Sequence, residues 1–412
     1  MQRYFVIDRE MSPGDTGFEA MVERAYSIKS KVRCLCRRDR DLDLYIANRQ
    51  GAYILARWPG TGALHAYYCD HYEAPDFLTG IGQVRGQAVV DDDVTGETLL
   101  KFGFALSRGP ARSAPASFTN DKPDVRSTGQ KLSIRGFLHY LWDRAQLTHW
   151  HPAMQGKRNW FVVRRELVSA ALSCKVRGES LGQYLFVPET FKLDDKEAIS
   201  RRRHGELSVA DASRDAIMIM VGEVKSIEKA RFGEKMLIKH LPEWPFLIDE
   251  DMARRFHKRF AVEEALWQSD DDGGHLVMAA SFSIGASGLP QLYELSVMPV
   301  TRDWLPYEGL EERALLMKSV ASRRRFVKGM RVNLALNKPI ASLTFTDTPH
   351  EATAVYLTRN LPDPAYDKAL ADLMRTQGVS HMTWRTGDEL PSKGLAAQPI
   401  ATPSGVGSGK AH

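Results

Sequence analysis

The sequence has little cysteine and no long apolar segment. Only four of its 412 residues are cysteine, too few for a disulfide framework to account for the stability of a chain this long. The longest apolar run, Ala216–Val221, has the length of a strand and is far shorter than a membrane span. The first residues, Met1 to Tyr4, do not begin the apolar core of a signal peptide. We therefore expect a cytoplasmic protein without a membrane partner.

The scarce cysteines are clustered, and this clustering predicts a metal site. Three of the four lie in the segments Cys34-Leu35-Cys36 and Cys69-Asp70-His71, which are separated by 32 residues. Thiolate and imidazole ligands in tetrahedral geometry are preferred by zinc, so the predicted ligands are Cys34, Cys36, Cys69 and His71. His65 is an alternative fourth ligand. The alternative without a metal is a set of small buried thiols and a surface histidine.

The order Cys-x-Cys…Cys-x-His is similar to that of SWIM-type zinc fingers, although the spacer here is longer. Between the two segments, the sequence predicts two strands, at Leu42–Ile46 and Ala52–Ala56. A structural Zn²⁺ would join the two ends of this small antiparallel meander, which needs such support.

Net charge is small overall, at +5, but it is unevenly distributed. Between Lys131 and Glu179 there are nine Lys or Arg and three Asp or Glu residues, so this segment carries +6 and the rest of the chain −1. A local cationic surplus suits a polyanion such as DNA, because neutralised phosphates release counterions. A solvated helical face that only keeps the protein soluble explains the same charges.

Two helices are expected within the basic segment. Ser133 can cap the first, which begins near Ile134, and the second runs Trp160–Leu172. A Pro- and Gly-containing turn joins them, so the pair resembles a helix-turn-helix in outline. The residues predicted to bind nucleic acid lie at the start of the second helix and in its first half: Lys157, Arg158, Arg164 and Arg165.

The overall pattern predicts a multidomain α+β protein. The first predicted domain, residues 1–106, is an antiparallel β module stabilised by zinc. A Pro/Ser-rich linker is predicted to follow over 107–130. A basic helical domain covers 131–200 and an α/β domain covers 201–390. In the last, strands are expected at Ala216–Val224, Leu276–Ile284 and Gln291–Met298, and helices at Asp249–Trp267, Glu311–Phe326 and Asp363–Gln377. Residues 391–412 are rich in Ala, Pro, Gly and Ser and are expected to be disordered.

Several blocks together resemble an uncharacterised bacterial family, domain of unknown function number 1173, which is met on plasmids and integrating elements. The resemblance covers nearly the whole chain and is carried by Arg33-Cys34-x-Cys36, Cys69, Gly136–Trp142, Trp150–Trp160 and the 343–384 region. It implies a context of mobile-element DNA and an N-terminal cysteine cluster.

The 340–384 region also resembles the end of a PD-(D/E)xK nuclease fold. Such enzymes bind a divalent metal through an Asp on one strand and a Glu on the next, because Mg²⁺ prefers oxygen ligands. Here Ala341 stands at the Asp position, and Ala354 and Tyr356 stand at the Glu and Lys positions. Asp347 and Glu351 lie nearby at other spacings, so we expect this site to be inactive.

A second Glu-x-Lys pair, Glu223 and Lys225, lies on a predicted strand, and Asp211 or Asp215 could supply a further carboxylate. Such short matches are frequent by chance. The sequence has no Gly-x-Ser-x-Gly elbow. Cys174, at a helix end, is expected to be buried.

Three functions follow from these observations. The first is a zinc-binding, non-catalytic accessory protein of a bacterial mobile element, with DNA and plasmid or integrative-element transfer proteins as partners. The second is a divergent metal-dependent nuclease that uses Glu223 and Lys225, or Asp347 and Glu351. The third is a protein–protein scaffold with structural zinc.

Overall fold

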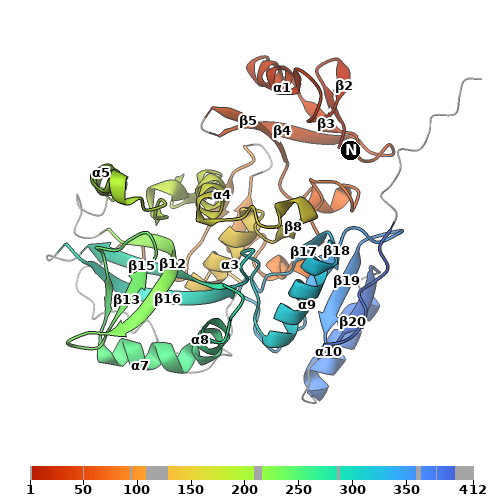
Figure 1. Cartoon of the computed structure of the whole chain (residues 1–412). Helices are drawn as coiled ribbons and strands as arrows, with labels where there is room; N and C mark the ends of the chain where they lie inside the picture. The colour runs from red at the N-terminus through yellow and green to blue at the C-terminus, as the bar shows by residue number, and fades with distance from the viewer. Residues whose placement is uncertain are drawn as a thin grey trace, which may run out of the picture.

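The computed structural model describes residues 2–49, 51–92, 95–107, 129–207, 216–284, 288–358, 363–376 and 378–394. Within these residues the protein is a mixed α+β structure whose strands form four sheets (Figure 1). No helix in the described residues has the length and apolar character that a membrane crossing requires. Most of the predicted linker, 107–130, and of the predicted tail, 391–412, lies outside the described residues.

The N-terminal sheet is antiparallel and has the strand order β2-β1-β3-β4-β5. Val6, Val32, Cys34 and Leu44 are its most buried residues, and α1 packs on its β1 and β5 strands. A short helix is also predicted from the sequence over Phe18–Ile28; it is present as α1, and the two predicted strands of the meander are present as β4 and β5. The elements are β1 Tyr4–Val6, β2 Arg9–Met11, α1 Phe18–Ser27, β3 Val32–Cys34, β4 Leu42–Arg49 and β5 Ala52–Arg57.

A small second sheet, in the order β10-β9-β7-β6, lies beside helices α3 and α4. Ser133 caps α3 by accepting a hydrogen bond from the backbone N–H of Gly136 (3.0 Å), as the sequence predicts, and Asn159 caps α4. The elements are α2 Asp76–Thr79, β6 Val89–Asp91, β7 Thr98–Leu100, α3 Ile134–Arg144, α4 Trp160–Leu172, β9 Cys174–Val176, β10 Glu179–Ser180 and α5 Lys196–Glu206. Cys174 is fully buried in this core, as expected.

The connection between α3 and α4 is longer and more structured than a helix-turn-helix turn. It contains a short strand, β8 His149–Trp150, which pairs with the C-terminal sheet, and a 3-10 turn, Pro152–Met154. Because β8 is held in another sheet, the path between the two helices is set by that sheet rather than by a tight turn.

The third sheet closes on itself. β12, β13, β14, β16 and β15 follow one another, and β15 pairs again with β12; β11 is attached at the edge (Figure 1, green). Its interior holds Met220, Phe246, Phe256 and Phe282. The elements are β11 Leu185–Phe186, β12 Met218–Lys229, β13 Glu234–Ile238, β14 Phe246–Ile248, α7 Glu250–Arg259, α8 Ala261–Gln268, β15 His275–Ile284 and β16 Pro290–Val300.

The C-terminal sheet has the order β20-β19-β18-β17-β8, in which only β19 and β20 are parallel. Its elements after the closed sheet are α9 Leu310–Ala321, β17 Phe326–Lys328, β18 Leu343–Phe345, β19 Thr353–Leu357, α10 Pro364–Thr376 and β20 Ser380–Trp384. One face of this sheet shares a core with the N-terminal sheet, in which Cys34 and Cys69 pack with Ala354 and Tyr356.

The predicted helices and strands of the second half are present, with differences in extent. The strand predicted to end at Val224 continues to Lys229 in β12. The helix predicted over Asp249–Trp267 is broken at Phe260 into α7 and α8. The helix predicted to reach Phe326 ends at Ala321, because Arg323 adopts a positive φ of 52° and Phe326 begins β17.

Candidate metal centre

The cysteines and His65 are brought together by the N-terminal sheet and the chain that follows it. Cys34 ends β3 and lies between Tyr4 of β1 and Leu42 of β4. Cys36 follows two residues later. His65 comes directly after the 3-10 turn Gly62–Leu64, and the next turn, closed by the hydrogen bond from Cys69 N to Ala66 O (2.8 Å), brings Cys69 back toward Cys34.

The four donor atoms, Sγ of Cys34, Cys36 and Cys69 and a ring nitrogen of His65, all lie within 4.8 Å of one another. Sγ of Cys34 is 3.6 Å from Sγ of Cys69, and Nδ1 of His65 is 3.4 Å from Sγ of Cys36 and 3.7 Å from Sγ of Cys69. Ideal tetrahedral zinc with ordinary bond lengths places sulfurs about 3.8 Å apart and sulfur and nitrogen about 3.6 Å apart. The group can therefore hold a metal ion.

N–H donors surround the sulfur atoms. Nε2 of Gln2 lies 3.0 Å from Sγ of Cys34 and 3.0 Å from Sγ of Cys69. The backbone N–H of Ala66 donates to Sγ of Cys36 (3.4 Å) and that of His71 to Sγ of Cys69 (3.3 Å). Such donors stabilise negative charge on sulfur and orient the ligands of a metal.

Three adjacent thiols cannot all ionise without a cation. Hydrogen bonds from Cys34 and then Cys69 lower the pKa of Cys36. Hydrogen bonding to Cys36, and then burial, raises the pKa of Cys34 to about 12, although the contact with Cys69 opposes this. Hydrogen bonding to Cys34 and Cys36, with burial, raises the pKa of Cys69. A bound cation would compensate the charge of all three and release protons.

The structure places His65, rather than the predicted His71, among the cysteines. Nε2 of His71 instead lies 3.0 Å from the hydroxyl of Tyr4, and burial lowers the pKa of His71 to about 4. The two imidazole rings are neighbours, with centroids 5.5 Å apart. His65 is 2% exposed, and its Nε2 has no hydrogen-bond partner among the described residues. His65 is the fourth ligand that the sequence offers as the alternative to His71, and it directly follows the 3-10 turn Gly62–Leu64.

The four basic residues predicted to bind nucleic acid differ in their surroundings. The Arg158 guanidinium donates to the backbone carbonyls of Leu147 (2.8 Å) and His149, and burial lowers the pKa of Arg158 to about 10. Arg164 donates to the carbonyl of Val187 (2.9 Å) and pairs with Glu206 (3.2 Å). Arg158 and Arg164 therefore support the fold. Lys157 and Arg165 are exposed.

Glu223 and Lys225 do not form a metal-binding pair. Glu223, 3% exposed, is bound by Lys239 and by Nδ1 of His275 (2.6 Å), whereas Lys225 is exposed. The ladder between β12 and β13 shifts by one residue between Val224 and Ser226, so Lys225 occupies the bulge. Asp211 and Asp215 lie outside the described residues.

The carboxylates near the C-terminal sheet are also separated. Asp347, nearly buried, accepts two hydrogen bonds from the Arg324 guanidinium (3.0 and 2.8 Å) and one from the backbone N–H of Arg325 (2.9 Å), while Glu351 is exposed. Ala341, Ala354 and Tyr356 are fully buried and supply no metal ligands.

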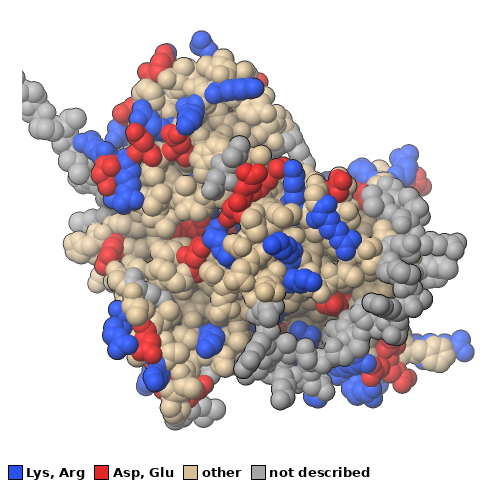
Figure 2. Space-filling model, turned by 180° about the vertical axis from the view of Figure 1, so that it is seen from behind, with Lys and Arg blue, Asp and Glu red and all other residues tan. Residues whose placement is uncertain are grey.

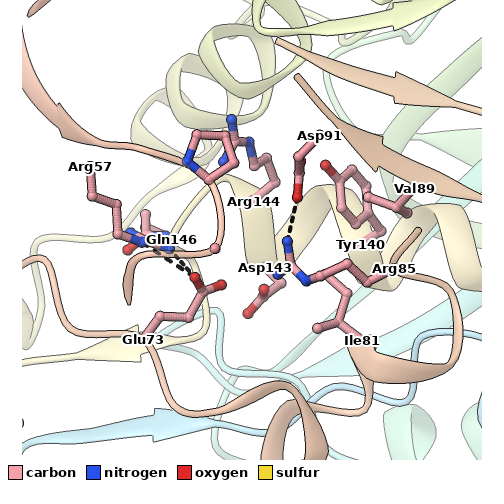
Figure 3. Close-up of a pocket in the computed structure, with 12 residues that line it drawn as sticks. Arg57, Glu73, Ile81, Arg85, Val89, Asp91, Tyr140, Asp143, Arg144 and Gln146 are labelled. Atoms are coloured by element: carbon pink, nitrogen blue, oxygen red, sulfur yellow. Dashed lines mark hydrogen bonds and ion pairs between the residues drawn. The ribbon is translucent and has the colours of Figure 1, made fainter. Parts of the chain in front are cut away.

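Charged residues also line a pocket between the N-terminal module and α3 (Figure 3). Arg57 pairs with Glu73 (2.7 Å), and Arg85 pairs with Asp76 (2.5 Å) and Asp91. Burial raises the pKa of Asp143, on α3, to about 6. Since Arg57 and Arg85 are bound to carboxylates, this pocket is a polar junction between the two parts of the chain.

Comparison with known protein families places the chain in a family of unknown function. A family model described as "protein of unknown function (DUF1173)" matches residues 4–387. No curated protein and no solved structure matches the chain. Because the family model spans nearly the whole chain, the protein belongs to this family.

Proposed function

For this member of the DUF1173 family we propose that Cys34, Cys36, Cys69 and His65 hold one zinc ion. The observation that carries the proposal is the grouping of four donor atoms within 4.8 Å of one another, with three donor pairs at 3.4, 3.6 and 3.7 Å, close to the spacing in tetrahedral zinc. Three thiolates and one imidazole are ligands that zinc prefers.

The proposed role of the ion is structural. Four protein ligands fill a tetrahedral zinc site and leave no position for a substrate or a catalytic water. The loop that carries the ligands also contacts the C-terminal sheet region: Asp70 pairs with Arg325 (3.1 Å), and the Tyr67 hydroxyl donates to the carbonyl of Pro349 (3.3 Å). The ion would thus fix both the N-terminal sheet and its attachment to the C-terminal sheet.

Removal of the ion tests this role. We expect a zinc chelator to lower the unfolding temperature of the protein and to expose the N-terminal sheet to hydrogen exchange first. The matched control is the triple variant Cys34→Ser, Cys36→Ser, Cys69→Ser, on which the chelator has no further effect. A wild-type protein whose unfolding temperature does not change on chelation contradicts a structural ion.

We further propose that the protein is a non-catalytic, nucleic-acid-binding accessory protein. The mobile-element context rests on the family resemblance, and the nucleic-acid partner rests on local positive charge. Lys157 and Arg165 are the exposed members of the predicted surface. If that surface carries binding, Lys157→Ala with Arg165→Ala weakens DNA affinity and lowers its salt dependence. Unchanged affinity in this double variant removes it as the DNA surface.

No nuclease centre is proposed. Its carboxylate candidates, Glu223 and Asp347, are bound by basic side chains. We expect no Mg²⁺-dependent cleavage of DNA or RNA by the purified chain. Cleavage that is lost in Glu223→Gln or Asp347→Asn would restore the nuclease hypothesis.

A further inference from the structure

The closed sheet has a specific topology. If its strands are numbered in chain order from β12 to β16, their order around the sheet is 1-2-3-5-4 and back to 1. Strands 3 and 5, β14 and β16, are parallel, and all other neighbours are antiparallel. Helices α7 and α8 lie between strands 3 and 4. This is the strand order of the oligonucleotide/oligosaccharide-binding fold, in which strands 2 and 3 and the loops 1–2 and 4–5 contact the ligand.

One outer side of the closed sheet is covered by the rest of the protein. Ile219, Val221 and Val277 face outward from β12 and β15 and belong to the core that contains α3 and α4. Helix α3 contacts β15 and β16. This side is therefore unavailable to a ligand.

The outer side formed by the second half of β12, β13 and β14 remains open. Met236 and Ile238 of β13 point into the closed sheet, so Lys235, Leu237 and Lys239 point out. Glu228, Lys235 and Leu247 are aligned across the three strands, and Leu247 is 49% exposed. We call this side, with the β12–β13 turn, the hairpin face.

The hairpin face is cationic and carries an exposed aromatic ring. Residues 225–239 contain five Lys or Arg and two Glu, a net charge of +3. Lys235 pairs with Glu228 (3.0 Å) and Lys239 with Glu223 (2.5 Å), so the charge offered to a ligand comes from the other three cations. Lys225, Lys229 and Arg231 are exposed. Phe232, in the turn, is 75% exposed, and the Arg231 guanidinium lies 5.3 Å from the centre of its ring. On the view in Figure 2, basic and acidic side chains are interspersed over much of the surface.

We propose that the hairpin face binds single-stranded nucleic acid. Lys225, Lys229 and Arg231 contact the phosphates, and one base stacks on Phe232. A cationic strip beside an exposed ring is the arrangement by which proteins hold unpaired strands without sequence preference. The charge favours this polyanion over a neutral oligosaccharide, the other ligand class of this topology. An unpaired strand is favoured over a duplex, because only its bases are free to stack on a side chain.

This inference goes beyond the zinc site and gives the nucleic-acid hypothesis a surface far in sequence from residues 131–179. It does not depend on the metal. Each variant below is therefore checked for unchanged zinc content and unchanged thermal unfolding, so that a failure of the zinc proposal and a failure of this one are separate results.

The test is fluorescence anisotropy of the full chain with a labelled oligothymidine of about 20 nucleotides, the matching oligouridine, a duplex of equal length and a neutral oligosaccharide. We expect binding of the single strands at low salt. Phe232→Ala should weaken it about 5- to 100-fold, the loss expected for one stacked base. The triple variant Lys225→Ala, Lys229→Ala, Arg231→Ala should lower the slope of log affinity against log salt by about 2.

The matched control is Lys31→Ala with Arg375→Ala, which removes exposed charge that belongs to neither proposed binding surface and should bind like the wild type. Affinity for either single strand that depends on Phe232 supports the proposal, and the two arms distinguish DNA from RNA. Wild-type affinity in both hairpin variants, stronger binding of the duplex, binding of the oligosaccharide instead, or no binding of any single strand overturns it.

Discussion

The side-chain amide of Gln2 donates toward Sγ of Cys34 across a distance of 3.0 Å, and it is equally close to Sγ of Cys69. Gln2 therefore orients two proposed zinc ligands without binding the metal. We expect Gln2→Ala to lower zinc affinity about 10- to 100-fold, the usual effect of removing such a partner. Competition with a chromophoric chelator measures this, with Arg3→Ala as the control, since Arg3 pairs with exposed Glu10. Equal affinity in the two variants would show that Gln2 does not support the site.

Substitution of His65 and substitution of His71 should have different effects on zinc content and stability. His65→Ala removes a zinc ligand, so we expect the variant to be purified with little or no zinc. His71→Ala should retain the metal but lose about 1–3 kcal/mol of stability, because the buried hydroxyl of Tyr4 loses its partner. Zinc content and urea unfolding separate the two effects. Loss of zinc in His71→Ala with retention in His65→Ala reverses the ligand assignment.

Because of His139, on α3, we expect the free energy of unfolding to depend on pH. Burial, and then the charge of Arg135, lowers its pKa to about 3, below the ordinary histidine value of about 6.5. Its Nδ1 lies 3.0 Å from the carbonyl oxygen of Arg331. Since the unfolded state binds the proton more readily, the free energy of unfolding should fall as pH drops below about 6.5. This group alone accounts for a loss of about 2 kcal/mol between pH 7 and pH 5. Urea unfolding at both pH values checks it, and His139→Gln should reduce the difference. An equal pH dependence in the variant would assign it to other groups.

Gly136 is packed tightly against Asn333. A Cβ at Gly136 would lie 1.9 Å from Oδ1 of Asn333, which accepts hydrogen bonds from the backbone N–H (3.1 Å) and hydroxyl (3.0 Å) of Ser133. We expect Gly136→Ala to destabilise the protein by about 1–3 kcal/mol through overpacking. Gly205, in helix α5, has no atom within 4 Å of such a Cβ, so Gly205→Ala should be neutral or stabilising by up to about 1 kcal/mol. Urea unfolding compares the two, and a stable Gly136→Ala variant would refute the close contact.

Local patterns predicted the elements well, and the contacts between distant segments were not predictable from them. The helix at Phe18–Ser27 and the strands around Leu42 and Ala52 follow from periodicity within a few residues. The pairing of β8 with β17 could not be predicted in this way. It joins His149 to Val327, which are far apart in the sequence, so no local pattern indicates it. The order of strands in the closed sheet is likewise set by pairings far apart in sequence.

For the candidate site too, local sequence patterns identified some residues, while others depend on the folded structure. Scarce cysteines in two short segments identified three of the grouped residues from the sequence. For the fourth position the sequence offers His71, with His65 as the alternative, and the folded structure places His65 among the cysteines, while His71 contacts Tyr4. Charge in the sequence was equally ambiguous: Arg158 contributes to a basic segment but is bound to backbone carbonyls inside the protein. A count of charges cannot distinguish such an arginine from one that is free to contact phosphate.

The most direct test of the central claim is elemental analysis of freshly purified protein, prepared without chelator, beside Cys36→Ser and the Cys34/Cys36/Cys69 triple serine variant. The account predicts one zinc per chain in the wild type, a strongly reduced content in Cys36→Ser and none in the triple variant. Wild-type protein without zinc, or equal zinc in all three proteins, would contradict the proposed metal centre.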